Sequence, residues 1–365
     1  MPAIQRVRLD RLRIDNLRAL ERVEIAPGAG WNLFLGPNGA GKTSLLEAAF
    51  LLSHGRSFRS GINEILVRHG SPGYSIHGEL AGRTDTALRV GIARSGKRLE
   101  ARMDGESVAV AELLRHVAVL CFEPGSHDLI SGPTEERRRF LDWGLFHVEP
   151  DFLGVWRRYQ RALKQRNALL RNSATDADLD LWDHELARAA EPLTAMRQRY
   201  FDALRPLIVA LASDLLVELG QPRLQFDAGF DTDRPLDRVL LARRGRDQAR
   251  GHTSAGPHRA DWTLTFERAP RREHLSRGQE KLCAFACVMG QAGRFAIDNG
   301  EWPIICVDDL ASEMDLTHQC RIVATISASG AQILATATHE PEAFARLDAP
   351  VRRFHVEQGG VAVLL

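Results

Sequence analysis

The sequence lacks the features that mark several classes of protein. Its 365 residues include only five cysteines, and no two of them form a CxxC pair. A disulfide scaffold is therefore excluded, and the cysteines are expected to be reduced. No apolar run approaches ~18 residues, the length that crosses a bilayer, and no apolar segment of a secretory signal follows the N-terminus. These absences favour a cytoplasmic protein without a membrane-spanning segment.

Net charge is also nearly absent. The 48 Lys and Arg residues almost balance the 47 Asp and Glu residues, which leaves a formal charge of +1. This balance argues against a uniformly basic coat for nucleic acid but leaves room for a local basic face. A composition that is 44% hydrophobic and 26% charged is typical of a globular protein. The length suggests about two domains, or one domain with a large insertion.

The residue pattern changes after Pro133. Before it, alternating apolar residues and Gly-containing turns predict strands, the first of them interrupted by a bulge at Asp10 and Arg11. After it, a segment rich in Leu, Ala, Arg and Glu predicts helices at 134–146, 151–171, 178–190 and 192–219. We therefore predict an α/β fold in two parts. A discontinuous domain comprises residues 1–115 and 255–365, and a mostly helical domain of residues 116–254 is inserted into it.

A glycine-rich loop predicts a nucleotide site. Residues 36–43 read GPNGAGKT, match G-x-x-x-x-G-K-[ST], and lie between a predicted strand and a predicted helix. Such a loop turns its backbone N–H groups toward phosphate oxygens, and the helix N-terminus adds partial positive charge. Lys42 is expected to reach the β- and γ-phosphates of ATP, and the Thr43 hydroxyl to bind Mg²⁺. The predicted nucleotide contacts come from Gly36, Pro37, Asn38, Gly39, Ala40, Gly41, Lys42, Thr43 and Ser44.

An apolar strand that ends in two carboxylates indicates the same chemistry. Residues 303–309 read PIICVDD. A strand buried on both faces would deliver Asp308 to the sheet edge where the phosphate loop lies. There Asp308 suits Mg²⁺ binding, and Asp309 suits activation of the attacking water as a general base.

A third motif, LSRGQ at 275–279, begins a predicted helix. Ser276 is expected to cap this helix, Gly278 permits close approach, and the exposed N–H groups form a second anion site. One chain has little use for two helix N-termini at a single triphosphate. We therefore predict a head-to-tail homodimer in which Ser276, Gly278 and Gln279 of each copy complete the ATP site of the other.

Together, the three motifs resemble the head of ABC-type ATPases, with LSRGQ as the signature sequence. The resemblance implies that residues 311–315 form the D-loop that follows the carboxylate strand. It also implies that His339, which follows a predicted strand, senses the γ-phosphate and takes part in catalysis with Lys42, Asp308 and Asp309.

Three finer motifs are similar to those of RecF, a family of bacterial recombination-mediator ATPases related to the Rad50 and SMC heads. They are GRSFR at 55–59, GP-x-x-x-RR-x-FLD at 132–142, and SAGPHRAD at 254–261. The similarity covers nearly the whole chain. It implies an ABC-type P-loop ATPase head, whose lobe I has mixed sheets with helices, and an inserted, mostly helical lobe II without long coiled coils.

The family resemblance also implies a function. It implies an ATP-dependent DNA-binding protein of recombinational repair and replication-gap processing, which dimerises with ATP as a clamp on DNA. RecO and RecR are the implied partners in loading RecA, within the SOS response. The resemblance implies Mg²⁺-dependent hydrolysis that DNA stimulates. This hydrolysis is expected to be weak, because Asp309 stands where most ABC ATPases carry Glu and its shorter side chain positions water less well. No Gln follows the strand at 117–122, so the lobe-linking residue near Asp128 stays open.

Duplex DNA and single-strand/duplex junctions are the implied cargo. Contacts to DNA phosphates are largely independent of base sequence and sensitive to salt. A further basic stretch lies at 157–166. The arginines that are candidates for such contacts are Arg11, Arg13, Arg18, Arg56, Arg59, Arg68, Arg137, Arg138 and the run at 243–246.

Three other functions share parts of this pattern. A transporter ATP-binding subunit has the three motifs but lacks the segment RLRIDNLRAL at 11–20 and the arginine-rich helical region. A nuclease-coupled ATPase requires clustered carboxylates beyond 308–315, which the sequence does not show. A module that binds ATP without turnover differs only in that it releases no phosphate.

Overall fold

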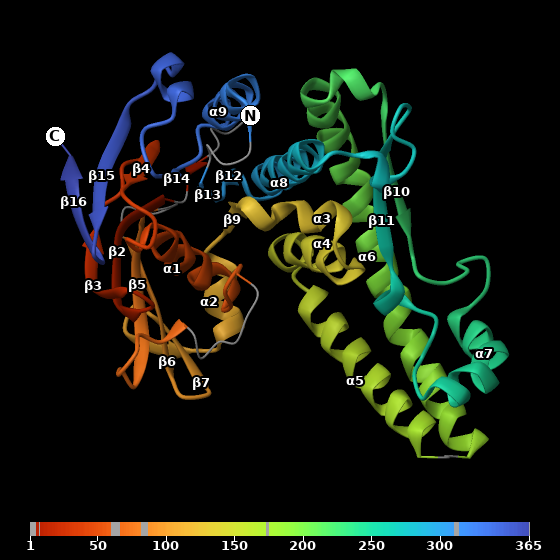
Figure 1. Ribbon diagram of the computed structural model, residues 1–365. Coiled ribbons are helices and arrows are strands. Elements are labelled where there is room, and N and C mark those ends of the chain that lie inside the picture. The colour runs from red at the N-terminus through yellow and green to blue at the C-terminus, as the bar shows by residue number, and fades with distance from the viewer. Residues whose placement is uncertain are drawn as a thin grey trace. The chain divides into compact units, whose positions relative to one another are not determined.

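The computed structural model describes residues 5–6, 8–59, 66–81, 87–172, 175–309 and 314–364. The chain forms two compact units, one of residues 1–126 and 284–365 and the other of residues 127–283 (Figure 1). Both divisions come later in the chain than the predicted ones at 115/116 and 254/255. The reason is strand pairing, because β9 (Val119–Phe122) pairs with β13 (Ile304–Val307) in the first unit, and β11 (Asp261–Phe266) pairs with β10 (Pro222–Asp227) in the second.

The first unit contains two six-stranded sheets. One has the order β16-β15-β4-β14-β13-β9, in which all neighbours are parallel except the β15–β16 hairpin. The other is antiparallel, with the order β3-β2-β5-β6-β7-β8. The remaining strands of the first sheet are β4 (Trp31–Leu35), β14 (Ile333–Ala337), β15 (Val351–Glu357) and β16 (Gly360–Leu364). Those of the second are β2 (Arg8–Leu17), β3 (Leu20–Ile25), β5 (Gly73–Ala81), β6 (Leu88–Ser95), β7 (Arg98–Met103) and β8 (Glu106–Val108).

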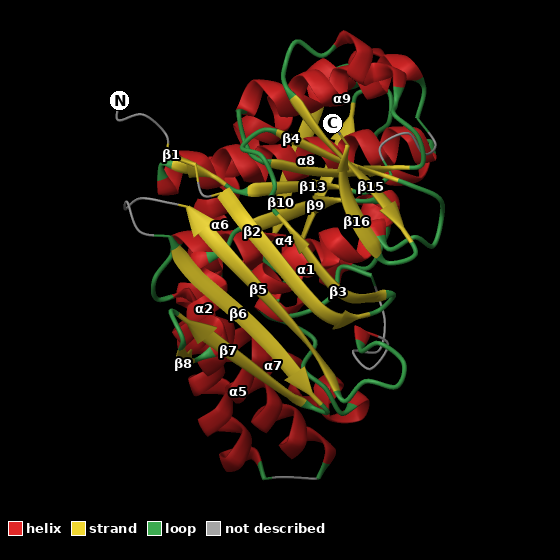
Figure 2. Cartoon of the chain, turned by 90° about the vertical axis from the view of Figure 1, so that its left-hand side faces the viewer, coloured by secondary structure: helices red, strands yellow, loops and turns green. Residues whose placement is uncertain are grey.

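Helix α1 (Lys42–His54) lies between these sheets. It contacts β9, β13 and β14 on one side and β2, β5 and β6 on the other, and nearly all of its residues are buried (Figure 2). A register shift in β2 between Leu9 and Arg11 confirms the predicted bulge. The unit is completed by α2 (Val110–His116), α9 (Leu316–Ser329) and a short parallel pair of β1 (Gln5–Arg6) with β12 (Glu301–Trp302). The start of α1 is therefore held at the parallel sheet by packing on both of its faces.

The second unit is mostly helical. It contains α3 (Asp128–Ser131), α4 (Thr134–Val148), α5 (Phe152–Arg171), α6 (Asp176–Leu215) and α7 (Leu236–Arg250), beside the β10–β11 hairpin. The chain then enters α8 (Arg277–Asn299), and the division between the two units falls inside this helix. Within the described ranges, no helix is both long and apolar enough to cross a membrane.

The predicted break before Pro192 is wrong, because α6 continues through it as one helix of 40 residues. Proline removes one backbone hydrogen bond and ordinarily ends or bends a helix. Here Pro192 is exposed, and so is Arg188, whose carbonyl would otherwise accept from residue 192. Meanwhile Ala190 and Leu193 are buried on the inner face. Packing on that face keeps the helix intact across the proline.

Buried ion pairs join the helices of the second unit. Arg166 on α5 is fully buried, and its guanidinium donates to Asp183 on α6 and, at 2.8 Å, to Asp247 on α7. Arg244 on α7 donates to the other oxygen of Asp183 at 2.7 Å and also to Asp180. Since each buried carboxylate has a guanidinium partner, the network fixes α5, α6 and α7 against one another.

Tyr159 and His258 tie α5 to the segment 254–261. The Nε2 atom of His258 lies 3.0 Å from the Thr253 carbonyl oxygen, which can only accept, so Nε2 carries the proton. Nδ1 then accepts from the Tyr159 hydroxyl at 2.6 Å. Burial lowers the pKa of His258 to about 4, so the ring is neutral at pH 7.

We expect Arg166→Ala to lower the free energy of unfolding by about 3–5 kcal/mol, because Asp247 would stay buried without a positive partner. Denaturant unfolding followed by tryptophan fluorescence measures this loss. Arg158→Ala is the matched control on the same helix, since Arg158 is exposed and lies 3.7 Å from Glu185. Its effect should stay below about 1 kcal/mol, and equal losses in the two variants would contradict the buried network.

The neutral His258 predicts that stability falls in acid. The folded-state pKa of about 4 lies below the ordinary 6.5, so the unfolded chain takes up a proton first as the pH falls. This contribution is complete above pH 6.5 and is lost between about pH 6.5 and 4, by up to about 1.4 kcal/mol per pH unit. Unfolding midpoints across this range should fall less steeply for His258→Gln than for the natural chain. Parallel curves would show that His258 does not titrate as described.

Candidate functional site

The phosphate loop joins β4 to α1 and needs glycine at two positions for steric reasons. A Cβ atom on Gly36 would lie 2.0 Å from the backbone oxygen of Val356 in β15. Gly41 has a φ of 108°, and a Cβ atom there would lie 2.8 Å from the side chain of Leu20. The loop is thus packed against β15 on one side and the start of β3 on the other, which fixes its backbone.

Lys42, the first residue of α1, is buried beneath this loop. Its Nζ atom donates to the carbonyl oxygens of Gly36 at 2.6 Å and Pro37 at 2.8 Å. Burial lowers the pKa of Lys42, while the nearby charges of Asp309 and Asp308 act to raise it. The ammonium group therefore already lies within the loop where a phosphate group would be bound.

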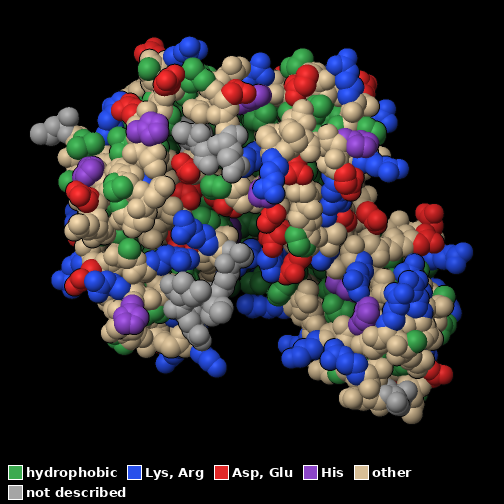
Figure 3. All heavy atoms as spheres, viewed as in Figure 1, with side chains coloured by type: hydrophobic (Ala, Val, Ile, Leu, Met, Phe, Trp, Pro, Cys, Tyr) green, Lys and Arg blue, Asp and Glu red, His purple; other side chains and the backbone are tan. Residues whose placement is uncertain are grey.

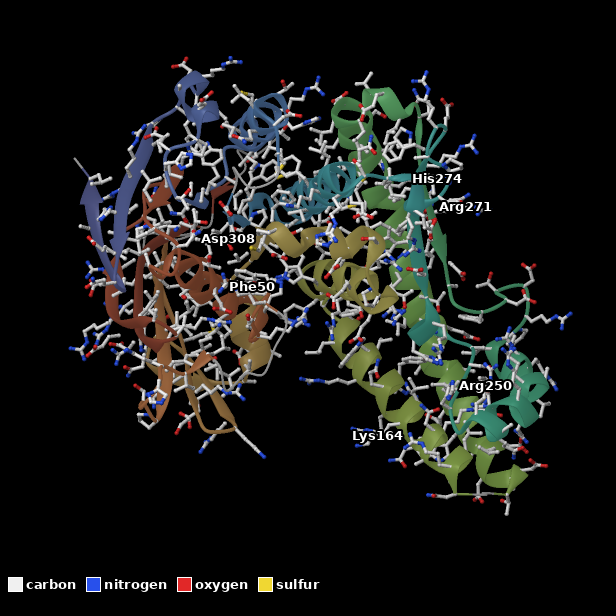
Figure 4. All side chains as sticks on the ribbon, viewed as in Figure 1. Phe50, Lys164, Arg250, Arg271, His274 and Asp308 are labelled. Atoms are coloured by element: carbon white, nitrogen blue, oxygen red, sulfur yellow. The ribbon has the colours of Figure 1, made fainter. Side chains whose placement is uncertain are left out.

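Asp308 follows β13 and meets the phosphate loop across the sheet edge. Its Oδ1 atom accepts from the hydroxyls of Thr43 at 2.9 Å and Thr336 at 2.6 Å. Figure 4 labels Asp308 in the first unit. Burial raises the pKa of Asp308, and these two hydrogen bonds together with the charge of Arg59 oppose that rise. The backbone N–H of Asp309 donates to the Thr336 hydroxyl at 2.9 Å, and Asp309 has a φ of 52°. The structure thus brings Thr43, Asp308 and Asp309 together, as the two motifs predicted.

A cavity of about 470 Å³ opens over these groups. Its walls carry both loop backbone and cationic side chains, a combination that suits a triphosphate. The lining residues are Arg18, Ala19, Asn38, Gly39, Gly41, Lys42, Thr43, Ser44, Arg59, Pro124, Asp308, Asp309, Thr336 and Thr338.

The donor set fits a magnesium ion that is bound together with nucleotide. The Thr43 hydroxyl and the Asp308 carboxylate are adjacent oxygen ligands, which is the kind that Mg²⁺ prefers. Among the described residues, no group of three or more His, Cys, Asp or Glu side chains could hold a metal by itself. Phosphate oxygens would therefore have to complete the coordination.

Glu47 belongs to none of the predicted motifs, yet it binds Arg18, one of the residues that line the cavity. Glu47 lies one turn after Thr43 on α1 and is fully buried. Its carboxylate accepts two hydrogen bonds from the Arg18 guanidinium, one of them 2.8 Å long, and a third from the Ser57 hydroxyl. The sequence feature that marks Glu47 as a buried acid is its isolated position within the apolar run SLLEAAFLL of the helix. Through Glu47, α1 positions both Arg18 and the turn that carries Arg59.

In the second unit, the signature residues cap α8. Ser276 and Gln279 exchange hydrogen bonds between side chain and backbone N–H at 3.0 and 3.3 Å, which is a capping box. The Gln279 side chain also donates to Glu218 at 3.2 Å. A Cβ atom on Gly278 would meet nothing within 4 Å among the residues described. The helix N-terminus is therefore ordered and open beside Gly278.

The ABC resemblance also singled out His339 and the D-loop at 311–315. His339 follows β14, is exposed, and lies 3.0 Å through Nδ1 from the Thr338 hydroxyl. Of the expected D-loop at 311–315, residues 311–313 lie outside the described residues. Asp315 caps α9, because its carboxylate accepts from the backbone N–H of His318 at 2.9 Å.

Comparison with known proteins gives the family. The RecF/RecN/SMC N terminal domain family matches residues 8–362. The DNA replication and repair protein RecF of Stenotrophomonas maltophilia is 48% identical over 98% of this chain and 100% of its own length. That of Xanthomonas oryzae pv. oryzae is 47% identical over 97% and 98%. This chain belongs to the RecF family.

Solved structures share the fold of this RecF-family chain. The recombination mediator protein RecF with ATPrS, of the RecFOR pathway, superposes with a TM-score of 0.88 over 100% of both chains at 22% identity. An Smc head domain with an extended coiled coil, bound to the C-terminal domain of ScpA derived from Pyrococcus furiosus, gives 0.59 over 99% and 96% at 14% identity. The architecture is therefore that of an ABC-type ATPase head with mixed sheets and helices.

The prediction that Arg137 faces DNA is wrong for this RecF-family chain. Arg137 is 1% exposed, and its guanidinium pairs with Asp261 and donates to the Gly132 carbonyl at 2.9 Å. Arg244, in the run at 243–246, is likewise buried against Asp180 and Asp183. Both arginines hold segments of the second unit together, so neither offers its charge to a ligand.

The other candidate arginines have mixed surroundings. Arg138 is half-buried and donates to the Ala260 carbonyl at 2.9 Å. Arg59 is exposed and lines the nucleotide cavity, and its charge acts to lower the pKa of Asp308. Arg18 is bound to Glu47. Arg56 is exposed as well. Three more have acidic partners. Arg11 is exposed and lies 2.8 Å from Glu24, and Arg13 is exposed and lies 3.2 Å from Asp15. Arg68 is half-buried and lies 3.0 Å from Glu21. DNA contact by these arginines stays a prediction.

We expect Glu47→Gln to weaken ATP binding severalfold and to lower the free energy of unfolding by about 1–3 kcal/mol, because Arg18 would lose its charged partner. Fluorescence titration with an ATP analogue and thermal unfolding measure the two effects. In a double-mutant cycle with Arg18→Gln, the losses should not add. Asp15→Asn, which removes an acid from a more exposed arginine cluster, is the control. Unchanged nucleotide affinity in Glu47→Gln would refute the positioning role.

Proposed function

We propose that this chain is an ATP-dependent DNA-binding protein of recombinational repair that hydrolyses ATP weakly and closes as a homodimer on DNA. The observation that carries the proposal is the hydrogen bond between Thr43 and Asp308, which joins the phosphate loop to the carboxylate strand at one cavity. RecF relatives of nearly equal length support the repair role. RecO and RecR as partners, RecA loading and DNA-stimulated turnover are further parts of this proposal.

The residues of the cavity divide the chemistry among them. Lys42 would turn from the carbonyls of Gly36 and Pro37 to the β- and γ-phosphates. Thr43 and Asp308 would hold Mg²⁺, which when bound neutralises phosphate charge. Asp309, whose backbone is fixed by Thr336, would accept a proton from the attacking water.

A second copy would complete the site. Ser276 and Gly278 stand at an open helix N-terminus, where backbone N–H groups and the helix dipole favour an anion. In the proposed dimer, this end of one copy contacts the γ-phosphate held by the other. Hydrolysis would remove that contact and release the clamp.

We expect Asp309→Asn to reduce hydrolysis about 100-fold or more while ATP binding is retained, because the general base would be lost. Phosphate release with Mg²⁺ measures turnover. The variant should then sediment as a dimer with ATP and as a monomer with ADP or without nucleotide. Adding Ser276→Arg should abolish the dimer, whereas Ser95→Arg, at an exposed hairpin position, should not.

The outcomes separate the parts of the proposal. A natural chain that binds ATP but releases no phosphate would be a binding module, not an ATPase. A dimer that persists with Ser276→Arg would show that the signature does not act across the interface. A monomer under all conditions would contradict the ATP-driven clamp.

A further inference from the structure

Helix α5 carries a stripe of positive charge, and none of its residues lines the nucleotide cavity. The helix sequence FLGVWRRYQRALKQRNALLR contains six basic residues and no acidic residue. One of them, Arg166, is buried in the ion-pair network, and the other five are exposed. Figure 3 shows Lys and Arg side chains gathered on the part of the second unit that α5 forms. The exposed five are Arg157, Arg158, Arg161, Lys164 and Arg171.

Four of these side chains share one face of the helix. Arg157, Arg161, Lys164 and Arg171 are spaced by four, three and seven residues, which is the spacing of a single face. At about 1.5 Å per residue, they extend over roughly 21 Å. Lys164 extends away from the neighbouring helices (Figure 4).

Few local acids neutralise this stripe. In the part of the chain that the structure describes, Arg157, Arg161 and Lys164 have no carboxylate within the 4.0 Å of an ion pair. Arg158, beside the stripe, reaches Glu185 only at 3.7 Å, and Arg171 donates to the Gly251 carbonyl at 3.3 Å. Unpaired like charges on one helix face repel one another, which an anionic ligand would relieve.

The opposite face of α5 is firmly held. Tyr159 and Leu163 are buried, and Arg166 between α6 and α7 binds Asp183 and Asp247. Because the helix cannot rotate without breaking these buried pairs, the stripe is presented in a fixed orientation. Because the helix backbone is already ordered, this row of cations loses less backbone freedom on binding than a flexible segment would.

The chemistry of the stripe favours a phosphate backbone over a protein. Protein interfaces have a core of aromatic and apolar side chains from which charges are depleted. Among the described residues, none of the large exposed hydrophobic side chains lies on α5. Duplex DNA, by contrast, presents about one negative charge per 1.7 Å of its axis. We propose that Arg157, Arg161 and Lys164 on α5 bind the phosphate backbone of duplex DNA, an inference that rests on the proposed function and names its surface.

The test compares two variants of equal charge. R157Q/R161Q/K164Q removes three of the four charges of the stripe and keeps Arg171, and R139Q/R188Q/R199Q removes three exposed arginines that have acidic partners. With ATP and Mg²⁺, fluorescence anisotropy on a short labelled duplex should show affinity lowered at least about tenfold for the stripe variant only. Its plot of log affinity against log salt should be shallower by about 2.7, since each phosphate contact contributes about 0.9.

Direct contact has its own readout. A photo-crosslinking amino acid in place of Arg161 should form an adduct with the duplex, and the same group in place of Arg188 should not. ATP affinity and unfolding midpoints of both triple variants should match the natural chain, because all six positions are exposed.

Different results would contradict the proposed function and the α5 surface. If the natural chain does not bind duplex DNA with ATP, the proposed function is wrong, and this surface with it. If the natural chain binds but the stripe variant binds equally well with the same salt dependence, only the α5 surface is wrong. A stripe variant that keeps DNA binding but loses binding to polyglutamate would make α5 a site for an acidic protein, which also overturns the inference.

Discussion

The Asp308 carboxylate is the group on which the candidate site depends. One of its oxygens accepts hydrogen bonds from Thr43 at the start of α1 and from Thr336 on β14. Thr336 in turn accepts from the backbone of Asp309. Three segments that are far apart in sequence are thereby joined at one sheet edge. The strand order makes this possible, because β14 lies between β4 and β13 and places its threonine between their ends.

The cationic side chains of the same site already interact with other groups of the protein. Lys42 is bound to loop carbonyls, Arg18 to the buried Glu47, and Arg59 acts on Asp308. A nucleotide must therefore replace existing interactions, and its affinity is the difference between new contacts and those lost. These hydrogen bonds also keep Lys42 and Arg18 in place before the nucleotide arrives. Charge is then positioned by the fold and needs little rearrangement when phosphate binds.

The central chemistry of the site could be predicted from sequence because its two motifs are local. The loop at 36–43 and the strand at 303–309 each show their residue types within a few positions, and parallel strands end at a common edge. Glu47 could not be assigned in this way. Its partners Arg18 and Ser57 come from other segments, and only the fold brings them to one carboxylate. Sequence can mark an isolated acid in an apolar helix, but it does not identify the cation that stabilises it.

The buried arginines of the second unit lie in the apolar phase of their helices. Arg166 follows Tyr159, Ala162 and Leu163 by seven, four and three residues, so it shares their buried face, while Lys164 belongs to the exposed one. Arg137 similarly precedes Leu141 and Leu145 by four and eight residues. An arginine in the apolar phase of a helix is expected to be buried, and burial requires a carboxylate partner. Periodicity therefore separates structural arginines from surface ones. It does not supply the partner, since Asp261 lies 124 residues from Arg137 along the chain.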